Sequence, residues 1–287
     1  MKYNGLYTCF LFLSVLLMPF QGYSQLDLFN KKESLQDLNY KTLVVVLEND
    51  SMVDLALREA VEKKWELSDF RFCDTEEFDK IKGDTSYYFL VRVKGIFKKE
   101  REPAIEFLSL LKGGPAGVKG VDKMADILSL QLQPADDREG RIVPFIESYI
   151  NIIQSHVLRI QRKKIAAHIG LAWYANRLSG ISGKKVLINE EDLAGNLSRE
   201  AVERLLKNGV SLADETEIDQ ALARGDAATL VTLCVAPGVE QQGSYCYKML
   251  ISTDNNELFY YKKQKVSPKT PKGFLKDDIE AIVFYFK

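Results

Sequence analysis

The same five-residue string, Arg-Glu-Ala-Val-Glu, occurs at residues 58–62 and again at 199–203. A strand-like apolar run precedes each copy, at 41–47 and at 184–188. A Thr-Glu helix start, a Gly-Asp pair and three more strand-like runs follow each copy in the same order. Because a repeated order of elements is harder to obtain by chance than one short string, the sequence predicts an internal repeat. The alternative is two unrelated α/β halves that share a common surface-helix string.

The three later runs of the first half pair with three runs of the second: 87–93 with 230–235, 104–110 with 245–251, and 127–132 with 258–263. Each half then ends in a helical pattern. The predicted fold class is therefore α/β (α+β). It consists of two tandem related units of strand, helix and further strands, each closed by a helix and joined by a long helix.

The domain boundaries follow from these patterns. Residues 25–40 are a polar lead-in, residues 41–140 the first unit, and residues 184–287 the second unit with a carboxyl-terminal helix. Between the units, residues 141–178 carry an apolar stripe at helical spacing and predict one long closing and connecting helix. In the second unit we expect a helix that stops at Asn208-Gly209 and buries Leu197, Ala201, Val202, Leu205 and Leu206.

The amino terminus has the pattern of a signal peptide. Lys2 supplies a positive start, an apolar core of modest length covers residues 11–18, and small residues precede Gln25. Such a core is too short for a stable membrane anchor, so we expect residues 1–24 to be removed by cleavage after Ser24. We predict a periplasmic or secreted protein whose mature chain has no transmembrane helix.

The composition argues against several function classes. The 287 residues carry a formal net charge of −1, and no basic patch with interleaved aromatic residues stands out. We therefore expect no nucleic-acid partner. The two histidines, His156 and His168, fall on different faces of the predicted long helix, which argues against a zinc site. Nucleophile-elbow and nucleotide-binding motifs are missing, so we expect no metal and no cofactor.

Acidic residues follow the first strand of each unit. Glu48 and Asp50 come after residue 47, and Glu190, Glu191 and Asp192 come after residue 188. Ligands of open α/β sheets tend to bind at the carboxyl ends of strands, where carboxylates act as acid and base or hold a cation. The same residue types also cap helix amino termini. Both interpretations stay open, and these five residues are the candidate catalytic residues.

Three cysteines remain once Cys9 leaves with the signal peptide. If the chain turns near Glu240, the two flanking strands place Cys234 opposite Cys246. A cross-strand disulfide is then one interpretation, and two small residues on a buried face are the other. Cys73 is expected to be a core residue, and an odd count leaves one cysteine unpaired in an oxidising compartment.

The second unit carries a likeness to a known family. The residues concerned are the strand at 186–188 with its following helix, the stretch 210–222, Gly225-Asp226-Ala227 and the strand at 230–235. Their order resembles the α/β domain of the TolB amino-terminal type, and proteins of the curli-secretion type carry a similar domain. The chain departs from that pattern at residues 226–228, where the family usually has a more apolar strand entry. The resemblance implies an envelope protein that binds or assembles, and it transfers no catalytic residue.

The end of the signal peptide, Ser24 before Gln25, resembles those of exported proteins from Gram-negative bacteria of the Bacteroides type. Together these features favour an exported, non-enzymatic binding or assembly protein of the cell envelope, whose partner is a protein or an envelope component. One alternative is a carboxylate-dependent hydrolase with its site at the ends of the first strands. The other is a structural dimerisation module, in which the apolar stripe of residues 146–173 stays exposed in the monomer.

Overall fold

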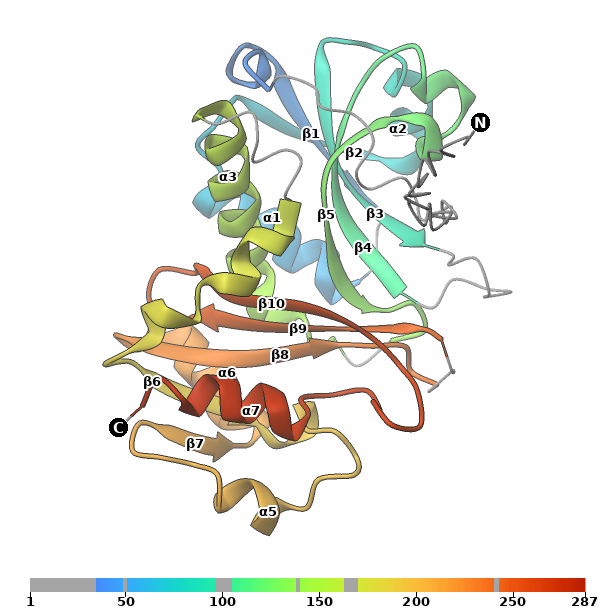
Figure 1. Ribbon diagram of the computed structural model, residues 1–287. Helices are drawn as coiled ribbons and strands as arrows, with labels where there is room; N and C mark the ends of the chain where they lie inside the picture. Colours follow the sequence, from blue (N-terminus) through green and yellow to red (C-terminus); the bar gives the residue numbers. More distant parts are fainter. Residues whose placement is uncertain are drawn as a thin grey trace, which may run out of the picture.

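The computed structural model describes residues 35–48, 51–95, 105–137, 140–162, 170–239 and 243–286. The predicted signal peptide, the first part of the lead-in and Asp50 lie outside these residues. Within them the chain forms a mixed α/β fold with two five-stranded sheets (Figure 1). None of the helices in the described ranges has the length and apolar character needed to cross a bilayer.

The first sheet has the strand order β2-β1-β3-β4-β5. Its strands are β1 (Thr42–Leu47), β2 (Phe70–Asp74), β3 (Tyr87–Gly95), β4 (Ile105–Lys112) and β5 (Ala125–Pro134). β1 runs parallel to β2 and β3, whereas β4 and β5 continue the sheet in antiparallel pairs. Two helices, α1 (Met52–Lys64) and α2 (Thr75–Ile81), make the parallel connections. β1 lies between two strands with its residues mostly buried, which explains its continuous apolar run.

The second sheet repeats this arrangement in the order β7-β6-β8-β9-β10. Its strands are β6 (Lys185–Asn189), β7 (Val210–Ala213), β8 (Thr229–Val235), β9 (Tyr245–Ser252) and β10 (Leu258–Lys265). β6 is parallel to β7 and β8, and the later pairs are antiparallel. The helices are α5 (Arg199–Glu203), α6 (Glu215–Arg224) and α7 (Lys276–Val283). The prediction of two tandem α/β units is confirmed, because both sheets share one strand order and one pattern of directions.

The repeated string lies in a helix in both units, but the two helices differ in length. The first copy is part of α1, which has 13 residues, and the second forms the five-residue α5. A serine caps each helix: the Oγ of Ser51 accepts from the Asp54 amide, and that of Ser198 from the Ala201 amide. The expectation that the second helix extends to Leu206 is wrong, and Ala201, expected on its buried face, is exposed. After α5 the amides of Leu205 and Leu206 bond three residues back, and such tightened turns end an α-helix.

The connection between the units is less regular than one long helix over residues 141–178. The α-helix α3 covers Ile146–Arg162, whereas Gly170–Asn176 forms a tighter 3-10 helix. Gly170 has a φ of 53°, which an α-helix does not accommodate and which glycine adopts without steric cost. The predicted helix is therefore confirmed for α3 and wrong from Gly170 onward.

Helix α3 lies at the junction of the two sheets, beside α1 (Figure 1). Its side chains Tyr149, Ile150, Ile153 and Val157 are fully buried. They belong to one hydrophobic cluster that includes residues of both sheets. The hydroxyl of Tyr149 donates to the carbonyl of Gln131 in β5 at 2.5 Å. The apolar stripe found in the sequence therefore forms the shared core of the two units.

The β8–β9 hairpin has a different register from the one predicted. Cys234 pairs with Lys248, and Val235 pairs with Tyr247, so Cys234 does not lie opposite Cys246. The shift is two residues along β9. Because side chains alternate along a strand, a shift of two keeps both cysteines on the same face of the sheet. The hydrophobic pattern alone does not distinguish the two registers.

Candidate functional site

The parallel strands of both units direct their carboxyl ends toward the junction. Glu48 directly follows β1, and the 3-10 helix Glu190–Asp192 directly follows β6. Ser51 and Asn189, not the neighbouring acids, provide the side chains that cap the elements starting there. The strand-end carboxylates are therefore available for other contacts.

In the first unit the acids gather around Arg92, a β3 residue whose side chain is 6% exposed. Its guanidinium lies 2.9 Å from Glu48, 3.2 Å from Asp54 and 3.6 Å from Glu106. Burial raises the pKa of Glu106, and nearby Glu48 adds to this, although Arg92 and a hydrogen bond from Gln133 act against it. Three carboxylates around one cation make this an acidic site.

A cavity of about 430 Å³ opens beside this cluster and is lined by Glu48, Arg92, Glu106, Gln133 and Asp137 among others. We call it the Arg92-side cavity. Gln133 is buried, and its amide nitrogen donates to Glu106 Oε2 at 2.9 Å, while its carbonyl oxygen has no hydrogen-bond partner within the described part of the chain.

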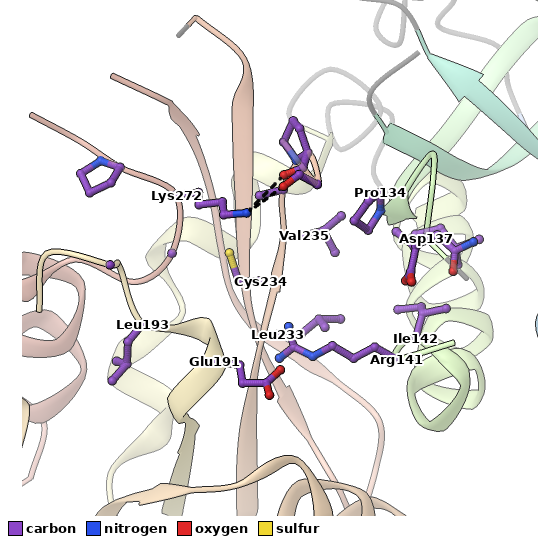
Figure 2. A pocket seen from close by; sticks show the side chains of 18 residues that line it. Pro134, Asp137, Arg141, Ile142, Glu191, Leu193, Leu233, Cys234, Val235 and Lys272 are labelled. Atoms are coloured by element: carbon purple, nitrogen blue, oxygen red, sulfur yellow. Dashed lines mark hydrogen bonds between the residues drawn. The ribbon is translucent and has the colours of Figure 1, made fainter. Parts of the chain in front are cut away.

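A second cavity of about 310 Å³ lies between the two units. We call it the Arg141-side cavity. Figure 2 shows the end of β5 and residues Asp137, Arg141 and Ile142 on one wall, with Glu191, Leu193, Cys234 and Lys272 on the other. The charges are of both signs and stand among apolar side chains. Such a lining is typical of a ligand or partner site.

Asp192 links two elements next to the Arg141-side cavity. Its side chain is fully buried, and its Oδ1 accepts from Arg141 Nη2 at 2.8 Å and from the backbone amide of Cys234 at 2.9 Å. Arg141 opens the connecting segment 141–178 and Asp192 belongs to the second unit, so the pair ties the connection to the second unit. Because Asp192 is engaged with Arg141 and with the backbone of β8, these contacts favour a structural role for it.

The two cavities adjoin, since Gln133 and Asp137 line both of them. We call the pair of cavities the junction cleft. It brings together Glu48 of the first unit and Glu191 of the second at its lining. Glu190 is instead paired with Arg199 at 2.6 Å on the surface. Of the five predicted candidates, the structure thus places two in the cleft, buries Asp192 and directs Glu190 away, and Asp50 lies outside the described residues.

Several cleft residues were missed from the sequence, notably Arg92, Glu106, Gln133 and Arg141. The sequence did contain a signal for Arg92 and Glu106, because each is a charged residue inside an otherwise apolar strand run. The register places Glu106 opposite Lys94 and Leu108 opposite Arg92, so Arg92 and Glu106 are diagonal neighbours on one sheet face. Opposite charges on adjacent apolar strands therefore pointed to a buried ion pair.

No protein family, curated protein or solved structure matches this chain. Within the described ranges, no three His, Cys, Asp or Glu side chains gather in a way that would hold a metal ion. The functional assignment therefore rests on the geometry of the junction cleft.

Proposed function

We propose that the chain is an exported, non-enzymatic binding or assembly protein of the cell envelope, and that its partner occupies the junction cleft. The observation that carries this proposal is the adjoining pair of cavities, to which both units contribute a strand-end carboxylate. A cleft built by two units at the carboxyl ends of their parallel strands is a favourable position for recognition.

The lining indicates the chemistry of the partner. The Arg141-side cavity offers apolar contacts from residues such as Leu193 and Leu233, with Glu191, Arg141 and Lys272 around them. A segment of a protein or an envelope component that brings an apolar group and polar groups of both signs fits this lining. The signal-peptide pattern and the resemblance to TolB-type domains support the envelope location, periplasmic or secreted.

A blocking variant tests the proposal. Gly195 lines the Arg141-side cavity, and a Cβ built there meets no atom within 4 Å, so Gly195→Trp adds a bulky ring at the cavity lining without a clash at its Cβ. Gly114→Trp is the matched control. A Cβ at Gly114 has its nearest neighbour, Thr85, at 3.8 Å, and this glycine lies in the connection after β4, outside the cleft lining.

The measurement is crosslinking in envelope extracts, followed by capture and comparison of the three proteins at equal folded concentration. We expect one partner to be captured by the original chain and by Gly114→Trp and to be lost with Gly195→Trp. Equal capture by all three proteins would place the partner elsewhere. Turnover of a small substrate with no captured partner would overturn the binding proposal.

A carboxylate-dependent hydrolase is the second candidate, and Glu106 is the observation that favours it. Its raised pKa suits a proton donor, and it faces the Arg92-side cavity together with Glu48. A panel of glycoside and peptide substrates with the original chain and Glu106→Gln tests this role. Activity that Glu106→Gln abolishes supports hydrolysis, and a panel without turnover argues against it.

The dimerisation proposal requires an apolar stripe that stays exposed in the monomer. In the described part of α3 the stripe is buried inside the chain, and Leu158, 37% exposed, is the only large apolar side chain there that reaches solvent to this extent. A second copy therefore finds little apolar surface on this part of the helix. The buried stripe therefore argues against dimerisation through this part of the helix.

A further inference from the structure

Two cysteine thiols face each other at the loop end of the β8–β9 hairpin. Cys234 is the penultimate residue of β8, and Cys246 is the second residue of β9. Cys234 pairs with Lys248, two residues beyond Cys246, so all three side chains share one sheet face. The two Sγ atoms are 3.9 Å apart, and both cysteines are free. To form a disulfide, the two sulfur atoms must approach from 3.9 Å to about 2.05 Å.

The two thiols differ in access. Cys234 is half-buried and lines the Arg141-side cavity, where Figure 2 shows its sulfur beside the cavity wall. Cys246 is fully buried. A reagent that enters the cavity therefore reaches Cys234 first and has no direct approach to Cys246.

The two thiols also differ in acidity. A hydrogen bond from Cys234 lowers the pKa of Cys246 against the effect of burial, and a backbone hydrogen bond from Gly273 and the ammonium of Lys248 lower it further. The same Cys234–Cys246 bond, together with burial and nearby Asp192, raises the pKa of Cys234. Negative charge in the pair is therefore favoured on Cys246, the sulfur that is shielded from solvent.

We infer that Cys234 and Cys246 form a reversible disulfide by exchange with an organic disulfide that enters the Arg141-side cavity. Access selects Cys234 for the first step although it is the less acidic thiol: its sulfur loses a proton and attacks the organic disulfide, whose S–S bond breaks and releases one thiol, leaving a mixed disulfide on Cys234. The Cys246 sulfur then attacks the Cys234 sulfur, forms the intrachain bond and releases the second thiol. Both cysteine protons end on the two released thiols, and two electrons reduce the organic disulfide.

The bond has a defined place in the molecule. It would join the two strands at the base of the connecting loop, in which Pro237 and Gly238 line the Arg141-side cavity. Lys272 also contacts this loop through the carbonyl of Gly238 at 3.2 Å. The cysteine pair thus lies beside the junction cleft, yet the inference does not depend on what the cleft binds.

The experiment exposes the reduced full chain to oxidised glutathione, unfolds it in iodoacetamide and maps its tryptic peptides. Residues 225–248 contain both cysteines and no internal Lys or Arg, so a closed bond appears as one peptide lighter by two hydrogen atoms and free of alkylation. We expect this result, reversed by dithiothreitol. Cys73 is the internal reference, because burial raises its pKa to about 11 and it should remain an alkylatable thiol.

Two single variants test the order of steps. In Cys246→Ser the glutathione adduct should persist on Cys234, whereas in Cys234→Ser the buried Cys246 should gain little adduct. The inference is overturned if the peptide of the treated original chain is doubly alkylated, or if the adduct on Cys234 persists there without closure.

Discussion

Arg141 of the connecting segment and Asp192 of the second unit pair at the junction, with Arg141 Nη2 donating to Asp192 Oδ1 at 2.8 Å. Asp192 is fully buried and also holds the amide of Cys234 in β8. A buried carboxylate that loses its cation is left with an uncompensated desolvation cost. The relative placement of the units, and hence the shape of the junction cleft, therefore depends on this contact.

Replacing Arg141 with Met should lower the free energy of unfolding by about 3 kcal/mol, because it leaves Asp192 buried and unpaired. The measurement is guanidinium-induced unfolding at pH 7. Arg199→Met is the control, since Arg199 pairs with Glu190 and Glu203 on the exposed surface, where water screens such pairs and they contribute little to stability. Equal losses in the two variants would contradict a special role for the Arg141–Asp192 contact.

Asp126 should make stability depend on pH. Burial raises its pKa from 3.8 to about 7, while Ser129 donates to only one of its oxygens at 3.0 Å. Between pH 4 and pH 7 the native state therefore keeps a proton that the unfolded state has lost, and stability falls as the pH rises. The free energy of unfolding of Asp126→Asn should exceed that of the original chain by about 2 kcal/mol at pH 8 and by little at pH 4.

Unfolding of both proteins by urea at the two pH values checks this prediction. Asp122→Asn is the matched control in the same segment, because Asp122 is exposed and paired with Lys123 at 2.7 Å. It should show no gain at pH 8. If Asp126→Asn gains nothing there either, Asp126 is not protonated in the native state at neutral pH.

The element order was predictable from the sequence because each element carries a local pattern. The apolar run of β1 and the helical stripe of α3 are each readable without knowledge of the rest of the chain. The register of the β8–β9 hairpin was not predictable, since a slip of two residues leaves Cys234 and Cys246 on the same face of the sheet. The Arg141–Asp192 contact was not predictable either, because it depends on how two separately patterned units pack together.

The candidate site was predictable only in part for the same reason. The position of Glu48 and Glu191 just after the first strands correctly predicted that both lie at a cleft. It gave no indication that Asp192 turns inward, which follows from the cation that Arg141 of the connecting segment supplies. Glu190 leaves the cleft because Arg199 of α5 is close enough to pair with it at 2.6 Å.

A buried cluster of Lys248, Lys262 and Asp278 should stabilise the packing of α7 on the second sheet. Asp278 accepts hydrogen bonds from Lys248 and from Lys262, and the side chains of Lys248 and Asp278 are both fully buried. Lys248→Met or Asp278→Leu alone should cost about 3–5 kcal/mol, because each leaves a buried charge without its main partner. The double variant should lie close to the original chain, since similar apolar volumes replace both charges.

A double-mutant cycle measured by urea unfolding gives the coupling between these two residues. Lys276 and Glu280 provide the control cycle, because they form an exposed pair on the same helix at 3.4 Å. Their coupling should be about 0.5 kcal/mol or less. Additive losses at Lys248 and Asp278 would show that the two charges act independently.

Closing the Cys234–Cys246 bond should stabilise the chain. The cysteines lie 12 positions apart, and a cross-link over a loop of that length raises the free energy of unfolding by about 3 kcal/mol through the lost entropy of the unfolded chain. Guanidinium unfolding of the oxidised and reduced forms measures the difference. Cys246→Ser should unfold at the same denaturant concentration with or without oxidant. If the oxidised original chain is no more stable than the reduced one, the closed bond strains the hairpin by as much as it restricts the unfolded state.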